Sequence, residues 1–277
     1  MALLSVKQLE KSYVKGAMVL KGLNTDVHEG EFIVIIGPSG SGKSTFVRCI
    51  NKIVDISDGD MIFDGTAVKG LSGKKLRRIR SQIGMIFQHY NLIGRTNVIK
   101  NVLHGRLGHV SSFKSALGLY SAEEKREAYN LLKTVGLADH IHKRAGELSG
   151  GQMQRVGICR AMMQNPKLLL ADEPIASLDP KSAEQVMELI HAMVKERKLT
   201  CIMNLHQVEF AKKYASRIIG LKNGEIVYDG APENLSESII SSIYEGKEDE
   251  MTLPEQAQTD MFKLGGTAGW ERQTQTA

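Results

Sequence analysis

The chain lacks the cysteine patterns of disulfide frameworks and zinc sites. Its three cysteines, Cys49, Cys159 and Cys201, are widely separated, and none belongs to a CxxC pair. Disulfides persist in oxidising compartments and are rare in the cytosol. This spacing therefore favours a reducing cytosol, with the three thiols as small core residues. A chain of 277 residues is also long enough to bury a sizeable core without covalent cross-links.

Long hydrophobic runs are missing as well. The longest uninterrupted apolar run is FIVII at 32–36, far short of the ~20 residues that a membrane-spanning helix needs. The N-terminal segment reaches Lys7 and Glu10 too early for the apolar region of a signal peptide. We therefore expect that the chain does not itself cross a membrane, and that any membrane function depends on other chains.

A strong charge of one sign is also absent. The chain has 36 Lys and Arg against 31 Asp and Glu, a net charge of +5. This excess is too small and too dispersed to indicate nucleic-acid binding, although it is compatible with phosphate ligands. The one basic stretch, KKLRRIR at 74–80, is interpreted as a solvated helix face. With 42% hydrophobic and 24% charged residues, the composition is that of an ordinary globular protein.

The apolar patterning predicts an α/β core with a helical insertion. Predicted strands lie at 3–9, 18–27, 32–37, 61–65, 82–88, 167–173 and 200–206, with a hairpin around Asn223-Gly224. From about 90 to 165, helical spacing prevails and no convincing strand is present. We predict one domain over 1–246, with a helical subdomain at about 90–165, and a loosely attached polar tail at 247–277.

A phosphate-binding motif follows the buried strand at 32–37. GPSGSGKST fits G-x-x-x-x-G-K-[ST] between a strand and a helix, the context that this motif requires. Its backbone N–H groups and the helix N-terminus would hold phosphates. Lys43 would reach the outer phosphates, and the Ser44 hydroxyl would hold Mg²⁺. The motif residues are Gly37, Pro38, Ser39, Gly40, Ser41, Gly42, Lys43, Ser44 and Thr45. A chance glycine-rich turn is the alternative.

Two carboxylates follow a second apolar strand, in LLLADE at 168–173. Because successive strand side chains point to opposite sides, one carboxylate can face a metal shell while the next faces a different volume. We assign Asp172 to Mg²⁺ and Glu173 to orienting an attacking water. The alternative is an acidic pair that caps a helix before Pro174. The presence of the phosphate-binding motif at 37–45, called the P-loop below, disfavours this alternative.

LSGGQ at 148–152 predicts a second anion-receptive helix start. Ser149, Gly150, Gly151 and Gln152 fall at the N-cap and first turn of a helical pattern. A chain with one nucleotide-hydrolysing site has no obvious need for a second segment that binds the γ-phosphate. Two copies arranged head-to-tail would use both, closing the P-loop of one and LSGGQ of the other on the same ATP. The alternative is an ordinary helix cap.

Together these motifs resemble those of ABC-type ATPase subunits over about residues 3–235. The P-loop, Gln88, LSGGQ, LLLADE, SLD at 177–179 and His206 occur in that family's order. The resemblance implies a P-loop NTPase core in a mixed sheet, with an N-terminal antiparallel β part. It also implies that Tyr13 stacks on adenine and that Gln88 reaches Mg²⁺ and the attacking water. Asp179 would signal across the dimer, and His206 would contact the γ-phosphate.

The stretches 87–108, 113–125 and 170–183 resemble more narrowly the ATP-binding subunits of phosphonate importers. That resemblance implies a homodimer of ATPase subunits, two integral membrane permease subunits and an extracytoplasmic phosphonate-binding protein. It places the chain at the cytoplasmic face of the inner membrane. His89-Tyr90 and Thr96-Asn97 depart from the pattern, so an importer of phosphite or another phosphorus oxyanion remains the alternative. A methionine or polar amino-acid importer fits less well. An ATPase that acts on DNA or the ribosome typically has long coiled coils or two ATPase domains, and neither is present here. A P-loop kinase would leave LSGGQ and the helical subdomain unexplained.

Overall fold

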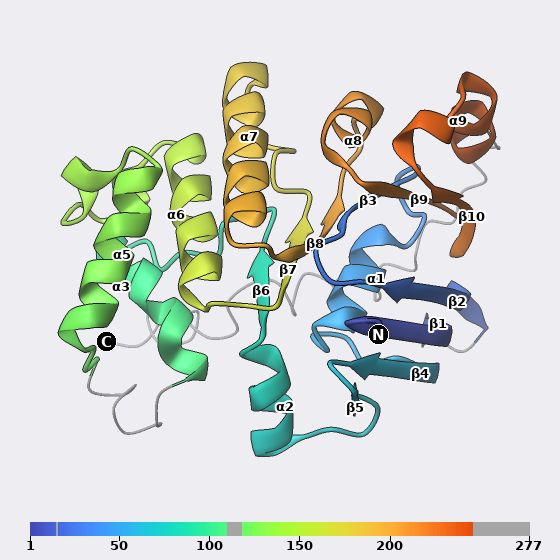
Figure 1. Cartoon of the computed structure of the whole chain (residues 1–277), viewed down its shortest axis with the longest axis horizontal. Helices are drawn as coiled ribbons and strands as arrows, with labels where there is room; N and C mark the ends of the chain where they lie inside the picture. The colour runs from blue at the N-terminus through green and yellow to red at the C-terminus, as the bar shows by residue number, and fades with distance from the viewer. Residues whose placement is uncertain (15, 110–117, 246–277) are drawn as a thin grey trace, which may run out of the picture.

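The computed structural model describes residues 1–14, 16–109 and 118–245. Its described part holds two β-sheets and the helices that cover them (Figure 1). The predicted tail at 247–277 lies outside the described residues, and so do residues 113–117 of the segment 113–125. None of the described helices combines the length and the apolarity that crossing a lipid bilayer requires.

The larger sheet carries the strands that end at the phosphate-binding motif and the carboxylates. Its strand order is β10-β9-β3-β8-β7-β6, and every neighbouring pair is parallel except β9 and β10. The strands are β3 (Phe32–Ile36), β6 (Ile83–Ile86), β7 (Leu168–Asp172), β8 (Thr200–Asn204), β9 (Arg217–Lys222) and β10 (Glu225–Gly230). The predicted hairpin at Asn223-Gly224 connects β9 to β10, which confirms that turn.

The smaller sheet is antiparallel, in the order β2-β1-β4-β5. Its strands are β1 (Leu4–Val14), β2 (Ala17–Val27), β4 (Asp58–Phe63) and β5 (Thr66–Ala67). The strand predicted at 3–9 continues to Val14. Its second half is only partly buried, so the apolar pattern fades there while pairing with β2 continues through an irregular register.

Helices lie between most of the strands along the described chain. The α-helices are α1 (Lys43–Ile50), α2 (Gly73–Arg80), α3 (Val98–Leu103), α5 (Ala122–Thr134), α6 (Gly150–Met163), α7 (Pro180–Glu196), α8 (Val208–Tyr214) and α9 (Glu237–Tyr244). Short 3₁₀ turns occupy η1 (His104–Gly108), η2 (Ala138–His140), η3 (Ala145–Glu147) and η4 (Pro232–Asn234). Only Ile79 of α2 is buried, as expected for a solvated helix face.

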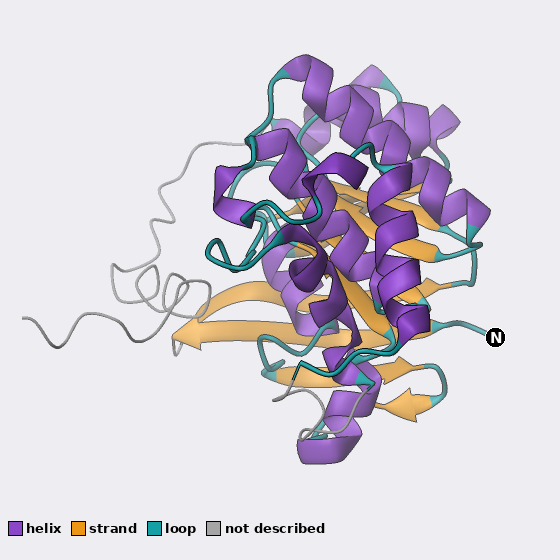
Figure 2. Ribbon diagram, turned by 90° about the vertical axis from the view of Figure 1, so that its left-hand side faces the viewer, coloured by secondary structure: helices purple, strands orange, loops and turns teal. Residues whose placement is uncertain are grey.

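Between β6 and β7 the described chain consists of helices and the loops that connect them, with no named strand. It holds α3, α5 and α6 with three of the 3₁₀ turns, and the strand-like pairing described there is a single isolated bridge, Asn97 with Arg144. Figure 2 views the molecule from the left-hand side of Figure 1, and these helices lie in front of the strands in that view. The helical character expected at about 90–165 is present, while the boundaries of a separate subdomain remain a prediction.

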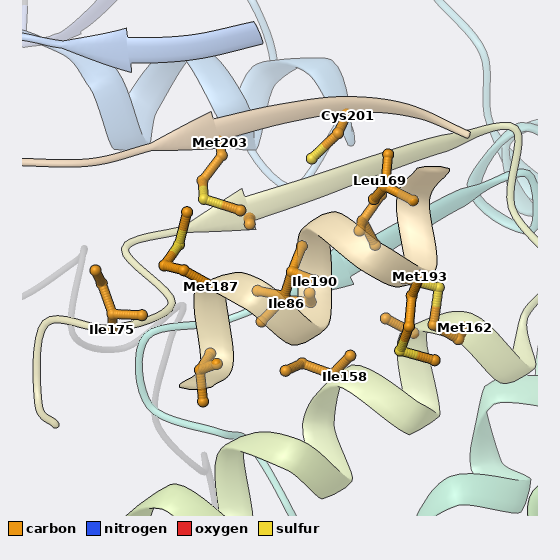
Figure 3. Close-up of a cluster of buried hydrophobic side chains, with 14 of the residues drawn as sticks. Ile86, Ile158, Met162, Leu169, Ile175, Met187, Ile190, Met193, Cys201 and Met203 are labelled. Atoms are coloured by element: carbon orange, nitrogen blue, oxygen red, sulfur yellow. The ribbon is translucent and has the colours of Figure 1, made fainter. Parts of the chain in front are cut away.

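Side-chain alternation divides the interior into two cores on opposite sides of the larger sheet. Phe32, Val34 and Ile36 of β3 face α6, α7 and α8, while Ile33 and Ile35 face α1 and the smaller sheet. Figure 3 shows the first core, in which Met187 and Ile190 of α7 pack on the sheet. The three cysteines are buried in these cores, as predicted.

Candidate functional site

The carboxyl ends of four parallel strands meet at one edge of the larger sheet. The register pairs Ile35 of β3 with Asn204 of β8, Asn204 with Asp172 of β7, and Ala171 with Ile86 of β6. The segments that follow these strands therefore emerge side by side. They carry the P-loop after β3, His206 after β8, Glu173 after β7 and Gln88 after β6. Ligands of open α/β sheets bind at such an edge.

The P-loop conformation depends on glycines at two tight places. Gly37 has φ 149°, and a Cβ there would lie 2.0 Å from the Leu221 carbonyl oxygen of β9. Gly42 has φ 102°, and its Cβ would lie 2.7 Å from Leu20 Cδ2. Neither position accepts a side chain without moving the loop. The loop is thus fitted between β9 and β2 before it turns into α1.

Lys43 lies at the centre of the loop. It is only 4% exposed, and its Nζ donates to the carbonyl oxygens of Gly37 at 2.7 Å and Pro38 at 2.9 Å. Burial lowers the pKa of Lys43, while the negative charges of Glu173 and Asp172 oppose that shift. The ammonium group is thus held by backbone carbonyls of the loop. The Ser41 hydroxyl of the same loop is buried and has no partner among the described residues.

Asp172 is buried with both carboxylate oxygens engaged. Its Oδ1 accepts from Asn204 Nδ2 at 2.9 Å, and its Oδ2 lies 3.3 Å from both Nε and Nη2 of Arg48. In β7, Asp172 lies on the same face of the sheet as Leu168 and Leu170, which pack toward α1. Strand alternation therefore explains why this carboxylate points to the P-loop helix.

Glu173 leaves the strand with a strained backbone. Its φ is 51°, a left-handed conformation that non-glycine residues seldom adopt and that concentrates at functional sites. Its Oε1 lies 2.7 Å from His206 Nε2. The strand ends at Asp172, so strand alternation does not govern Glu173 as the sequence suggested. The left-handed turn aims its side chain at His206.

Gln88 and Tyr13 flank this edge. Gln88 is half-buried and follows β6 by two residues, as Glu173 follows Ala171 by two in the paired strand β7. The Tyr13 hydroxyl lies 3.4 Å from Thr45 Oγ1 at the start of α1, and burial raises the pKa of Tyr13. Tyr13 thus contacts the P-loop helix, and its stacking on a base remains a prediction.

LSGGQ forms the predicted helix start. Ser149 is the N-cap of α6, with its Oγ accepting from Gln152 N while Gln152 Oε1 accepts from Ser149 N. Figure 1 places α6 well apart from α1, with α7 and β6 between them. The two anion-receptive helix starts of one chain therefore do not share a site.

Asp179 caps α7. Its carboxylate accepts from Ser182 N at 3.0 Å, with Pro180 in the first helical position. The hydrogen bond from Ser182 lowers the pKa of Asp179. Within one chain this residue is a helix cap, and a role across a dimer remains a prediction.

Comparison with known proteins places these features in a family. A family model described as ABC transporter matches residues 20–176. The chain is 53% identical over 244 residues to the phosphonates import ATP-binding protein PhnC 2 of Oceanobacillus iheyensis, covering 88% of this chain and 96% of that protein. It is 52% identical over 238 residues to a PhnC of Treponema denticola, covering 86% and 93%. The chain belongs to the ABC transporter family.

Solved ABC cassettes share the fold. A cassette described as a dimer in a post-hydrolysis state bound to ADP and Pi aligns with a TM-score of 0.73 and 33% identity, over 83% of this chain and 98% of that one. CbiO1 of Clostridium perfringens, part of an ABC transporter complex, aligns with a TM-score of 0.74 and 29% identity, over 94% and 99%. This ABC chain is accordingly an ATPase whose activity is coupled to transport.

The donor set at the strand edge fits a magnesium ion. The described residues contain no group of three or more His, Cys, Asp or Glu side chains placed to hold a metal. Mg²⁺ commonly takes one or two protein oxygens, with phosphate and water filling the remaining positions. The buried carboxylate of Asp172 and the buried, unpaired oxygen Asn204 Oδ1 beside it offer hard oxygen atoms of that kind.

Two residues of this edge escaped the sequence reasoning, namely Arg48 and Asn204. Arg48 stands five positions after Lys43 in α1, and Asn204 stands two positions before His206 in β8. A polar residue at the end of an apolar strand was the available signal for Asn204. Arg48 carried none, because arginine in a short amphipathic helix is ordinary.

Proposed function

We propose that this chain is the ATP-hydrolysing subunit of a bacterial importer of phosphonates. The observation that carries the proposal is the 53% and 52% identity, over most of the chain, to two proteins named for phosphonate import. The intact P-loop and both carboxylates at the strand edge support hydrolysis rather than a purely structural role.

In this proposal the chain's own residues divide the work on ATP. Tyr13 stacks on the base, while the P-loop from Gly37 to Thr45 holds the phosphates and Lys43 neutralises the outer ones. Ser44, Gln88 and Asp172 hold Mg²⁺, which would screen the phosphate charge. Phosphoryl transfer depends mainly on positioning and charge.

Glu173 and His206 then act at the reacting end of the nucleotide. Glu173 orients the attacking water, and His206 holds that carboxylate and contacts the γ-phosphate. Their 2.7 Å contact supports a shared task, because each side chain fixes the orientation of the other.

Two copies of the chain complete the site. The separation of α6 from α1 within one chain supports a head-to-tail homodimer. In it, Ser149, Gly150, Gly151 and Gln152 of one copy would close on the ATP held by the P-loop of the other. Asp179, at the start of α7, would report the state of one site to the second copy.

The remaining partners follow from the same proposal. Two integral membrane permease subunits would cross the cytoplasmic membrane, and an extracytoplasmic protein would deliver the phosphonate. The ATPase would lie at the cytoplasmic face, without contacting nucleic acid. Solute choice would reside in those partners, since the ATPase never touches the solute.

The test is the ATPase activity of the complete transporter in liposomes. The solutes compared are methylphosphonate, phosphite, phosphate and methionine, each with its binding protein. We expect stimulation by methylphosphonate, and a matched transporter with Glu173→Gln should show none. Stimulation by phosphite alone would replace the solute in this proposal, and stimulation by methionine alone would refute the phosphorus-compound assignment.

A further inference from the structure

The carboxylate of Asp172 is held from two sides by residues that the proposed function leaves without a task. Asn204 Nδ2 donates to Oδ1 at 2.9 Å, and Arg48 lies 3.3 Å from Oδ2. Asp172 is 3% exposed and Asn204 is fully buried. A buried charge held this way has little freedom to rotate.

The fold brings these residues to the same face of the larger sheet. Asp172 and Asn204 are register partners at the ends of β7 and β8. They lie on the same face as Leu170 and Ile202, which belong to the core beneath α1. Arg48 reaches the same place from α1, where it lies between Val47 and Cys49 of that core. Three elements thus converge on one carboxylate.

The two residues that donate to Asp172, Asn204 and Arg48, differ in charge and in exposure. Asn204 is neutral, and its Oδ1 is a buried acceptor with no partner among the described residues. That oxygen can accept a hydrogen bond from a metal-bound water. The Arg48 side chain is 30% exposed and carries a positive charge beside the carboxylate oxygen. A second cation at that oxygen meets repulsion.

We propose that Arg48 and Asn204 position Asp172 for a divalent cation, Asn204 strengthening and Arg48 weakening the hold of the site on that cation. Neither residue is a catalytic residue, because each acts through Asp172. Groups that orient a metal ligand typically change metal affinity by about 10- to 100-fold. Arg48 would keep the carboxylate ordered and limit metal affinity, so that Mg²⁺ leaves readily with the product.

This inference rests on the proposed function, since it takes Asp172 to be the Mg²⁺ ligand. The experiment is an equilibrium binding titration of a fluorescent ADP analogue to the full-length chain, first in Mg²⁺ and then in EDTA. ADP avoids turnover, so the readout does not depend on activity. The ratio of the two dissociation constants, EDTA over Mg²⁺, reports the contribution of the metal.

The two substitutions should move this ratio in opposite directions. Asn204→Leu should lower it about tenfold, and Arg48→Gln should raise it about threefold or more. Binding in EDTA should change little in either variant. Arg80→Gln and Asn51→Leu are matched controls and should leave the ratio unchanged. Arg80 donates to backbone carbonyls of Asn51 and Lys52, and the Asn51 amide contacts Met85 Sδ.

Melting temperatures of all variants separate positioning from simple loss of structure. Lower melting temperatures with an unchanged ratio in both variants would overturn the inference, as would a fall in the ratio for Arg48→Gln. If Arg48→Gln does not fold, Arg48→Lys retains the positive charge that weakens cation binding and should stay within about twofold of wild type. A tenfold fall there would also overturn the inference. Absence of ADP binding to the wild-type chain in both media would instead contradict the proposed function.

Discussion

The P-loop offers two identical substitutions whose costs should differ widely. Gly37 and Gly40 both have positive φ, 149° and 77°. A Cβ on Gly37 would lie 2.0 Å from the Leu221 carbonyl oxygen and 3.0 Å from Ser41 Oγ, whereas a Cβ on Gly40 meets nothing within 4 Å. Replacing each by alanine therefore separates backbone strain from collision within a single loop.

The magnitudes follow from these contacts. Alanine at Gly40 incurs only the left-handed backbone penalty, about 1–2 kcal/mol. Alanine at Gly37 must move by roughly 1 Å or more away from a carbonyl of β9, since Cβ atoms essentially never come within 3.0 Å of such a neighbour. That movement disturbs the 2.7 Å bond from Lys43 Nζ to Gly37 O. Overpacking and lost hydrogen bonding raise the expected cost to about 3–5 kcal/mol.

The assay is urea unfolding followed by circular dichroism, together with ADP binding. Gly37→Ala should lower the free energy of unfolding by about 1–4 kcal/mol more than Gly40→Ala, and should weaken ADP binding more strongly. Equal losses in the two variants would show that the loop is not fitted against β9 as the structure indicates.

Three further predictions concern Glu173, the three cysteines and Asp179. Glu173→Gln should reduce ATP turnover by about 10²- to 10⁴-fold while leaving an ATP-dependent dimer in sedimentation analysis; rapid turnover would remove Glu173 from its assigned role. Burial raises the pKa of Cys49 to about 12 and also raises the pKa values of Cys159 and Cys201. The folded protein should therefore resist thiol reagents at pH 8 until guanidinium is added, and a fast reaction without denaturant would contradict this burial. The pKa of Asp179 is lowered in the folded chain; its stabilising charge is present above the ordinary value near 3.8 and is lost as pH falls through the folded value. The melting-temperature difference between wild type and Asp179→Ala should thus be constant at pH 5–8 and shrink in acid, and a difference unchanged in acid would refute the cap.

The presence of the strands that carry the site was predictable because it follows from local apolar patterns. FIVII and LLLA are continuous apolar runs, and both lie in fully buried strands. Parallel neighbours end at the same edge, so motifs that follow such strands meet even when they lie more than 100 residues apart. The P-loop and Glu173 were found from the motifs that follow such runs, whereas His206 was assigned from the resemblance to ABC-type ATPase subunits.

The details of side-chain pairing were not predictable, because they depend on register and backbone strain. The left-handed backbone of Glu173 has no signature in LLLADEP. The pairing of Asp172 with Asn204 requires the β7–β8 register, which the sequence does not specify. Arg48 reaches Asp172 only because α1 packs over this end of the sheet.

The measurement that tests the central claim most directly is the uptake of labelled methylphosphonate into vesicles that carry the complete transporter. ATP is enclosed with the ATPase subunit on the inside, and wild type is compared with Glu173→Gln. The account predicts ATP-dependent accumulation with wild type and none with Glu173→Gln, even though the variant still binds ATP. Equal accumulation in both would mean that hydrolysis at this site does not drive import.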